Sequence, residues 1–194
     1  MPELRKVRPD AATLKALAHP VRLRMLGLLR LEGPDTATGL AERMGLNSGA
    51  TSYHLRQLEK HGLIEQDTER GNKRERWWMA AHDSTVLDVD SPLGTPEAEA
   101  GFGLIRSIVT LHIAQIERAM EVAPTLPAEW WQASTSSDAT VRLTAAEAKD
   151  LNERMYALLA EAKEMELARQ GAEPDGARPY TVLLHGFPYV GLTE

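Results

Sequence analysis

The fold is decided by a stretch between residues 38 and 62, which reads TGLAERMGLNSGATSYHLRQLEKHG. Thr38 is suited to cap a short helix that stops at Gly45, because its hydroxyl can accept a hydrogen bond from a free N–H of the first turn. Asn47 is suited in the same way to cap a second helix, which would run from Ser48 to about His61. Two short helices joined by a tight turn that contains glycine predict a helix-turn-helix unit.

The second helix of this unit has two chemically different sides. Thr51, Leu55 and Leu58 recur on one side, whereas hydroxyl and basic side chains occupy much of the other. Such side chains donate hydrogen bonds to phosphates and base edges, and the second helix of a helix-turn-helix enters the major groove. We therefore expect double-stranded DNA as a partner. The contacts expected from this helix are made by Ser48, Gly49, Thr51, Ser52, Tyr53, Arg56 and Lys60.

The segments on either side extend this unit. Upstream, a helical pattern from Thr13 to Gly33 is interrupted by His19 and Pro20, and a proline suits the first turn of a new helix. Downstream, residues 63–67 and 74–79 predict two strands joined by a turn. A basic two-stranded ribbon directly after a helix-turn-helix is typical of a wing that contacts DNA. The basic residues at its tip are Arg70, Lys73 and Arg74.

Several short motifs occur along this region. They read LAHPVR from residue 17, LAE from residue 40, SYHLRQL from residue 52 and GLI from residue 62. In this order and spacing they resemble the ArsR-type winged-helix repressors over roughly residues 12–80. The resemblance implies a homodimer that places two recognition helices in successive major grooves, with the wings near the flanking backbone. It also implies an effector as a further partner, because a metal ion or a small molecule releases many members of that family from DNA.

The chain lacks the residues of the familiar metal and catalytic sites. It contains no cysteine, and the helix expected from residue 98 to 121 offers only His112 as an imidazole ligand, so no metal site and no cofactor are expected. A metal-responsive sensor that uses other ligands stays open as an alternative. No nucleophile elbow, phosphate-binding glycine loop or His-Glu-x-x-His motif occurs, which argues against an enzyme. A winged helix that contacts only proteins is a further alternative.

The charge is unevenly distributed along the chain. The formal net charge is −6, which by itself does not suit a protein that binds DNA. Residues 1–80, however, carry 14 Lys and Arg against 10 Asp and Glu, whereas the remaining 114 residues carry 8 against 18. This asymmetry is expected when only the first part of a chain meets phosphates.

A long apolar helix is expected after a linker at residues 86–96. Its hydrophobic residues form two stripes, and a helix that is apolar on two sides must bury both. We expect one side to pack on the chain's own helix-turn-helix and the other on a second copy of the chain. Burial between two layers of the same chain is the alternative. The residues expected at the dimer interface are Phe102, Ile105, Ile108, Val109, Ile113 and Ile116.

The end of the chain predicts a small strand-helix-strand region. Residues 141–143 and 180–185 predict strands that pair either with each other or across a dimer. Between them, Thr144 and Glu147 form the pattern of a capping box that starts a helix. The buried side of this helix is expected to carry Leu151, Met155, Leu158, Leu159 and Ala162.

These expectations combine into a mainly helical α+β protein that regulates transcription. As a homodimer it would bind a palindromic operator, most simply as a repressor. No apolar run is long enough for a membrane span or a signal peptide, so no membrane partner and a cytoplasmic location are expected. Trp130 and Trp131 either anchor packing or line an effector pocket. The expected parts are a winged helix-turn-helix domain (1–85), a linker (86–96), a dimerisation helix with a connector (97–137) and a C-terminal strand-helix-strand region (138–194).

Overall fold

The computed structural model describes residues 5–70, 75–85, 91–169, 171–189 and 191. The chain divides into two compact units, of which unit 1 is Met1–Thr125 and unit 2 is Leu126–Glu194. The described helices include none that is long and apolar enough to cross a membrane.

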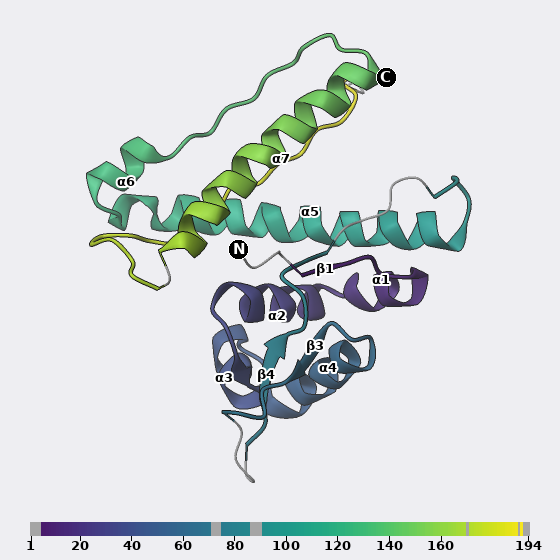
Figure 1. Cartoon of the computed structure of the whole chain (residues 1–194), viewed down its shortest axis with the longest axis vertical. Coiled ribbons are helices and arrows are strands. Elements are labelled where there is room, and N and C mark those ends of the chain that lie inside the picture. The colour runs from purple at the N-terminus through teal and green to yellow at the C-terminus, as the bar shows by residue number, and fades with distance from the viewer. Residues whose placement is uncertain (1–4, 71–74, 86–90, 170, 190, 192–194) are drawn as a thin grey trace. The chain divides into compact units, whose positions relative to one another are not determined.

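Unit 1 contains the helix-turn-helix, a small sheet and one long helix (Figure 1). Its strands are short, and its helices account for most of the described residues. The helices are α1 (Ala11–Leu17), α2 (Pro20–Leu31), α3 (Ala37–Met44), α4 (Ser48–Lys60) and α5 (Pro96–Val122), followed by a 3-10 turn at Ala123–Thr125. The strands are β1 (Lys6–Val7), β2 (Asp35–Thr36), β3 (Ile64–Gln66), β4 (Trp77–Ala80) and β5 (Ser84–Thr85). The mainly helical α+β class is confirmed.

The ends of the helices are set largely by local chemistry. Asn47 accepts a hydrogen bond from the Ala50 N–H at 2.8 Å and caps α4 as predicted. Gly45 ends α3 with a φ of 66°, in the left-handed region where a glycine costs least. The prediction for the start of α3 is wrong, because Thr36 rather than Thr38 is the cap. The hydroxyl of Thr36 accepts from the Gly39 N–H at 3.1 Å.

The main sheet has the order β2-β4-β3 and is antiparallel. The strands β3 and β4 form the predicted wing ribbon, in which Ile64 pairs with Ala80 and Gln66 with Trp78. No sequence pattern predicts β2, which pairs with the other edge of β4, or the parallel pair of β1 and β5. Each of these strands has two residues, too few for an alternating pattern to be visible.

The core of unit 1 joins all of the helix-turn-helix elements. Seven leucines of α1 to α4 are at most 6% exposed, and Trp78 of β4 packs against them. Burial of this apolar surface is the main source of stability for the unit. The core is completed by α5, whose Ala100 and Leu104 are buried in the same cluster and whose Ser107 donates a 2.5 Å hydrogen bond to the Ala18 carbonyl.

Unit 2 consists of two helices connected by extended chain. They are α6 (Ala128–Ala133) and α7 (Ala145–Ala168). The predicted capping box is confirmed, since the Glu147 carboxylate accepts from the Thr144 N–H at 2.7 Å and the Thr144 hydroxyl accepts from the Glu147 N–H at 3.3 Å. The predicted strands are absent, because residues 141–143 and 180–185 are extended but form no ladder.

The predicted buried side of α7 is also wrong. No described residue of unit 2 is buried, so α7 has no side that faces a core. Leu151 and Leu158 are exposed, the latter at 65%, whereas Met155 and Leu159 are half-buried. The Tyr180 hydroxyl donates to the Ala133 carbonyl at 3.1 Å, and the last described residues return along α7 (Figure 1). Part of the apolar surface of α7 is therefore left uncovered by the described residues of unit 2.

Candidate nucleic-acid interface

The recognition helix α4 is held by one side only. Thr51, Leu55 and Leu58 are each 0% exposed and pack on α2, α3 and β3. The opposite side carries one large apolar group, the ring of Tyr53, which is 53% exposed. A helix fixed along its buried side and open along the other can present side chains to a groove without changing shape.

Most of the predicted contact residues lie on this open side. Ser48 and Gly49 are exposed in the first turn, next to the Asn47 cap, and Ser52 is half-buried. The expectation for Thr51 is wrong, because its side chain is buried and its hydroxyl donates to the Asn47 carbonyl at 3.1 Å. The surface that α4 offers, called the α4 surface below, is made of Ser48, Gly49, Ser52, Tyr53, Arg56 and Lys60.

Arg56 and Lys60 are among the described cations of unit 1 that have no partner within the described residues. Within the described residues, neither side chain forms an ion pair or a hydrogen bond. Arg43 of α3, in contrast, is paired with both Glu32 and Asp35, the second at 3.1 Å. The α4 surface thus carries positive charge that the chain itself does not neutralise, which is the state suited to a phosphate or a base edge.

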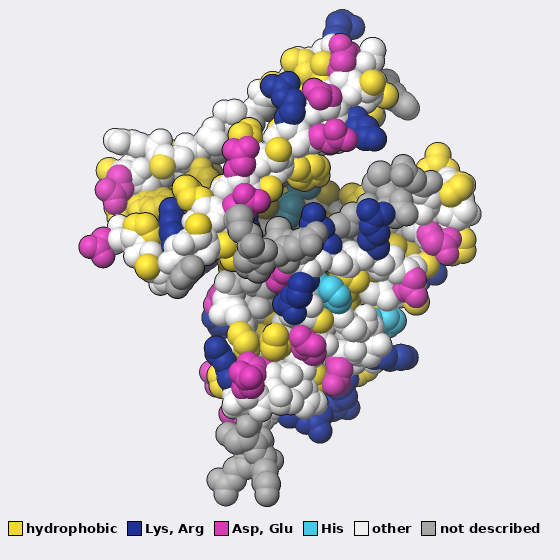
Figure 2. Space-filling view, viewed as in Figure 1, with side chains coloured by type: hydrophobic (Ala, Val, Ile, Leu, Met, Phe, Trp, Pro, Cys, Tyr) yellow, Lys and Arg dark blue, Asp and Glu magenta, His cyan; other side chains and the backbone are white. Residues whose placement is uncertain are grey.

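The wing is described in part. Arg70 is exposed and forms a 3.4 Å ion pair with Asp67, whose carboxylate also accepts from the backbone N–H groups of Glu69 and Arg70. The Asp67 carboxylate thereby shapes the start of the turn. The other two predicted tip residues, Lys73 and Arg74, lie outside the described residues. Figure 2 shows Lys and Arg side chains around the end of unit 1 that carries α3, α4 and β4, with acidic side chains interspersed on the same face.

Two histidines connect the recognition helix to the helix before it. His19 caps α2 by accepting from the Val21 N–H at 3.2 Å, and its ring centroid lies 4.7 Å from that of His54 on α4. Burial is the largest cause that lowers the pKa of each ring, and the nearby charge of Arg22 lowers both further. Both rings are therefore held in the neutral form, in which they pack without mutual repulsion. The sequence motifs contain both histidines but carry no signal that they meet.

The short helix α3 is positioned by a cluster at its first turn. The Asp35 carboxylate accepts from the Thr36 N–H at 2.7 Å and from Arg43. It lies so close to Gly39 that a Cβ atom there would be 2.2 Å from the Asp35 Oδ1 atom. Gly39 is thus required for the close approach of this carboxylate rather than for an unusual backbone angle. Sequence reasoning missed this cluster, although Asp35, Gly39 and Arg43 are spaced by four residues, one helical turn apart.

The long helix α5 leaves one of its apolar stripes uncovered. Ile108 is half-buried and packs against the core of unit 1, so it belongs to the covered side. The other predicted dimer residues are exposed, from 36% for Val109 to 52% for Ile113. This exposed set, called the α5 stripe below, consists of Phe102, Ile105, Val109, Ile113, Ile116 and Met120.

The described residues contain no group of three or more His, Asp or Glu side chains that could hold a metal ion. His54 is paired with His19, and His61 lies 3.3 Å from the Thr13 hydroxyl. The side chains of the α4 surface offer hydrogen bonding and positive charge.

Residues 17–67 match a family model described as "Helix-turn-helix domain". The chain is 47% identical over 57 residues to the HTH-type transcriptional regulator NmtR of Mycobacterium tuberculosis, which covers 29% of this chain and 47% of the relative. It is 43% identical over 65 residues to the HTH-type transcriptional regulator YgaV of Escherichia coli, which covers 33% of this chain and 63% of the relative.

Among solved structures, HlyU from Vibrio cholerae is similar with 29% identity over 36% of this chain and 71% of that chain, at a TM-score of 0.32. The chain thus spans about half to two thirds of the length of the curated relatives that it matches. The matched region includes α3, α4 and the turn between them, so the predicted helix-turn-helix domain is confirmed over residues 17–67.

Proposed function

We propose that this chain, whose helix-turn-helix domain is like those of HTH-type transcriptional regulators, binds double-stranded DNA and regulates transcription. The observation that carries the proposal is the α4 surface, where two unpaired cations and several hydroxyls lie opposite a fully buried helix side. Such a surface presents the donors that phosphates and guanine edges accept.

The α4 surface and the wing divide the contacts between them. Arg56 reads a base edge in the major groove, because a guanidinium matches the two acceptors of a guanine. Ser48, Ser52 and Tyr53 donate to phosphates or bases beside it. Arg70, together with Lys73 and Arg74, binds the phosphate backbone next to the wing and so contributes affinity more than sequence preference.

We further propose that two copies of the chain bind together through the α5 stripe. An exposed apolar row along a long helix is costly to leave in water and suits burial against an identical row across a two-fold axis. A dimer of this kind places two recognition helices about 34 Å apart, one turn of B-DNA. The operator is then roughly palindromic, and occupancy of it represses the adjacent gene.

Selection of bound duplexes from a random pool tests this function. We expect enrichment of two related half-sites whose centres are one helical turn apart. We also expect the affinity to fall steeply with added salt, because phosphate contacts release counterions. Recovery of an unselected pool, or binding that does not change with salt, would show that the winged helix serves protein contacts instead.

A further inference from the structure

The N-terminal arm of unit 1, residues 5–7, lies against the segment that leaves the wing. The strand β1 of this arm pairs in parallel with β5, which follows β4 after a short connection. Just before this pair, the Arg5 carbonyl accepts from the Asp83 N–H at 2.8 Å, and the Arg5 N–H donates to the Asp83 carboxylate at 2.7 Å. The arm is therefore attached to the root of the wing by backbone groups as well as by side chains.

The Arg5 side chain contacts both strands of the wing. Its guanidinium donates to the carbonyl of Ala80, the last residue of β4, at 3.3 Å and to the Asp83 carboxylate at 3.5 Å. It also forms a 3.8 Å ion pair with Glu65 of β3. The Arg5 side chain is 51% exposed, and an ion pair at such a position contributes at most about 1 kcal/mol to stability. The main effect of these contacts is therefore on where the strand ends lie.

A second guanidinium holds the same segment from α2. Arg30 is half-buried and donates to the His82 carbonyl at 2.9 Å and to the Thr85 hydroxyl at 3.0 Å. Burial is the largest cause that lowers the pKa of the Arg30 guanidinium, and the nearby Asp83 carboxylate acts in the opposite direction. The hydrogen bond from the Arg5 N–H is the largest cause that lowers the pKa of the Asp83 carboxyl, so Asp83 is charged at neutral pH. Its carboxylate binds Arg5 directly, and its charge stabilises the guanidinium of Arg30.

The basic side chain that the wing offers to DNA lies away from this root. Trp78 fixes β4 in the core, where it is 4% exposed, and the Asp67 N–H donates to the Trp77 carbonyl at 3.0 Å. Arg70 follows Asp67 in the turn. A small rotation of the strand ends displaces Arg70 by more than it displaces the root, because displacement grows with the distance from the axis. Contacts at the root thus control where the Arg70 guanidinium lies.

We propose that Arg5, Arg30 and Asp83, called the wing clip below, are positioning residues that set the direction in which the wing presents Arg70 to the DNA backbone. The inference rests on the proposed function, in which Arg70 binds a phosphate. The wing clip acts by holding the strand ends, so that less conformational freedom is lost when the phosphate is bound. Its loss lowers the affinity for every duplex and leaves the base preference of the α4 surface unchanged.

Variants of the full-length chain at Asp83 test this role. Asp83→Ala removes the acceptor that binds Arg5, whereas Asp83→Asn keeps an oxygen that can accept from the Arg5 N–H. Each variant loses the same negative charge, so charge alone predicts that both bind DNA equally and more tightly than the unaltered chain. The wing clip predicts instead that Asp83→Ala binds several-fold more weakly and that Asp83→Asn recovers most of this loss.

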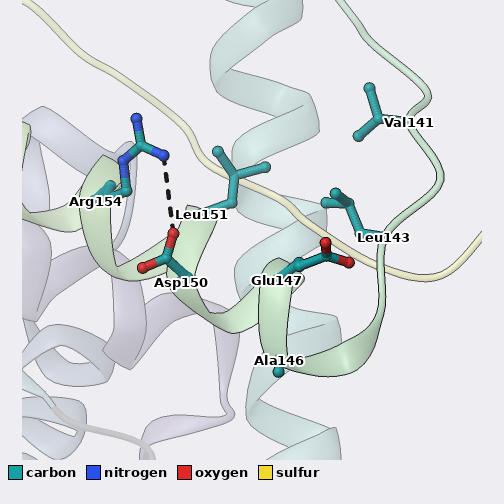
Figure 3. A pocket seen from close by; sticks show the side chains of 7 residues that line it. All are labelled: Val141, Leu143, Ala146, Glu147, Asp150, Leu151 and Arg154. Atoms are coloured by element: carbon teal, nitrogen blue, oxygen red, sulfur yellow. Dashed lines mark ion pairs between the residues drawn. The ribbon is translucent and has the colours of Figure 1, made fainter.

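The matched control is an aspartate that is paired with an arginine elsewhere in the chain. Asp150 of α7 forms a 3.8 Å ion pair with Arg154 at the edge of a hollow in unit 2 (Figure 3). Asp150→Ala removes the same charge and the same kind of ion pair as Asp83→Ala. It should keep the salt dependence of the unaltered chain, because it leaves the wing clip intact.

The salt dependence of binding separates positioning from stability. Fluorescence anisotropy is measured over a range of salt concentrations with the duplex recovered by selection and with a scrambled duplex. Loss of one phosphate contact lowers the slope of log affinity against log salt by about 1, and we expect this for Asp83→Ala on both duplexes. A variant that is merely less stable binds through its folded fraction, which keeps every contact and therefore the slope.

A double-mutant cycle connects the wing clip to Arg70. Arg70→Ala and Asp83→Ala each remove the same phosphate contact, so the double variant should bind about as weakly as the weaker single variant. Additive losses would show that Asp83 acts by another route and would overturn the assigned role.

The same titrations distinguish this inference from the proposed function. An unchanged slope in Asp83→Ala overturns the wing clip, and so do equal affinities of Asp83→Ala and Asp83→Asn. In both cases the proposed function stands if the unaltered chain binds the selected duplex and loses affinity with salt. Binding by the unaltered chain that does not change with salt contradicts the proposed function and the wing clip together.

Discussion

The imidazole rings of His19 and His54 lie with their centroids 4.7 Å apart and join the cap of α2 to the middle of α4. The Nδ1 atom of His54 is buried, and none of the described residues forms a hydrogen bond with it, so no described carboxylate or carbonyl stabilises a proton at that atom. Arg22 of α2 and Tyr53 of α4 flank the pair, and the Arg22 guanidinium donates to the Ala16 carbonyl. The orientation of the recognition helix thus depends in part on two neutral rings.

Lowering the pH is expected to destabilise unit 1. The pKa of each ring is below the usual 6.5 because burial disfavours the charged form. The unfolded chain therefore binds more protons as the pH falls through 6.5, so the stabilising contribution of the pair is complete above that pH and decreases below it. Urea unfolding at pH 7.5 and at pH 5.5 measures the change.

Replacement of one ring supplies the control for this pH dependence. We expect both His54→Gln and His19→Gln to reduce it. A pH dependence that both variants keep in full would assign the effect to other groups.

The substitution Gly39→Ala is expected to destabilise the chain by about 1–3 kcal/mol, the usual cost of an overpacked site. Its Cβ atom would meet the Asp35 carboxylate at 2.2 Å and displace it from Arg43 and from the Thr36 N–H. Gly27→Ala in α2 is the matched control, because that Cβ atom would meet nothing within 4 Å. The control should stabilise by up to about 1 kcal/mol through helix propensity alone. Equal shifts of the two melting temperatures would contradict the role of Asp35.

The substitution Arg56→Ala is expected to weaken DNA binding by about 1–3 kcal/mol and to relax preference at one base pair, if its guanidinium reads a guanine. Arg43→Ala is the control, since the Arg43 side chain is already paired with Glu32 and Asp35. Fluorescence anisotropy with the selected duplex and its single-base variants measures both effects. A uniform loss on every duplex after Arg56→Ala would reassign this residue to a phosphate.

The substitution Ile113→Glu is expected to dissociate the proposed dimer, because it places a charge in the middle of the α5 stripe. Ile113 is 52% exposed in the single chain, so the monomer should stay folded. Gln115→Glu adds the same charge on an exposed position of α5 outside the stripe and should leave the dimer intact. Sedimentation at micromolar concentration, with circular dichroism to confirm folding, distinguishes the two. A dimer that persists after Ile113→Glu would locate the interface elsewhere.

Local chemistry made the helix-turn-helix predictable. Caps such as Asn47, a stop such as Gly45 and the spacing of Leu55 and Leu58 each act within a few residues of chain, so the sequence contains the whole signal. The same holds for the capping box of Thr144 and Glu147. The exposure of most of the predicted residues of α4 follows from such features as well.

Contacts between distant residues decided the rest of the interface. Two threonines were available to cap α3, and Thr36 does so because Asp35 and Thr36 are held extended by pairing with Trp78 and Trp77 of β4. The contact of His19 with His54 and the burial of Thr51 likewise depend on how α4 packs. A sequence pattern cannot predict these contacts, because it contains no information on the distances between segments that are far apart in the chain.

The amino-acid sequence by itself determined the cap of α4, the end of α3 and the capping box of α7, as well as which side of α4 is apolar and that α5 is apolar on two sides. The tertiary structure alone decided what those sides meet. It places Leu104 and Ile108 of α5 against the core, leaves Ile113 exposed, and gives the leucines of α7 no interior to enter. The physical reason is that periodicity measures the apolar surface of a helix, whereas burial requires a second surface to cover it.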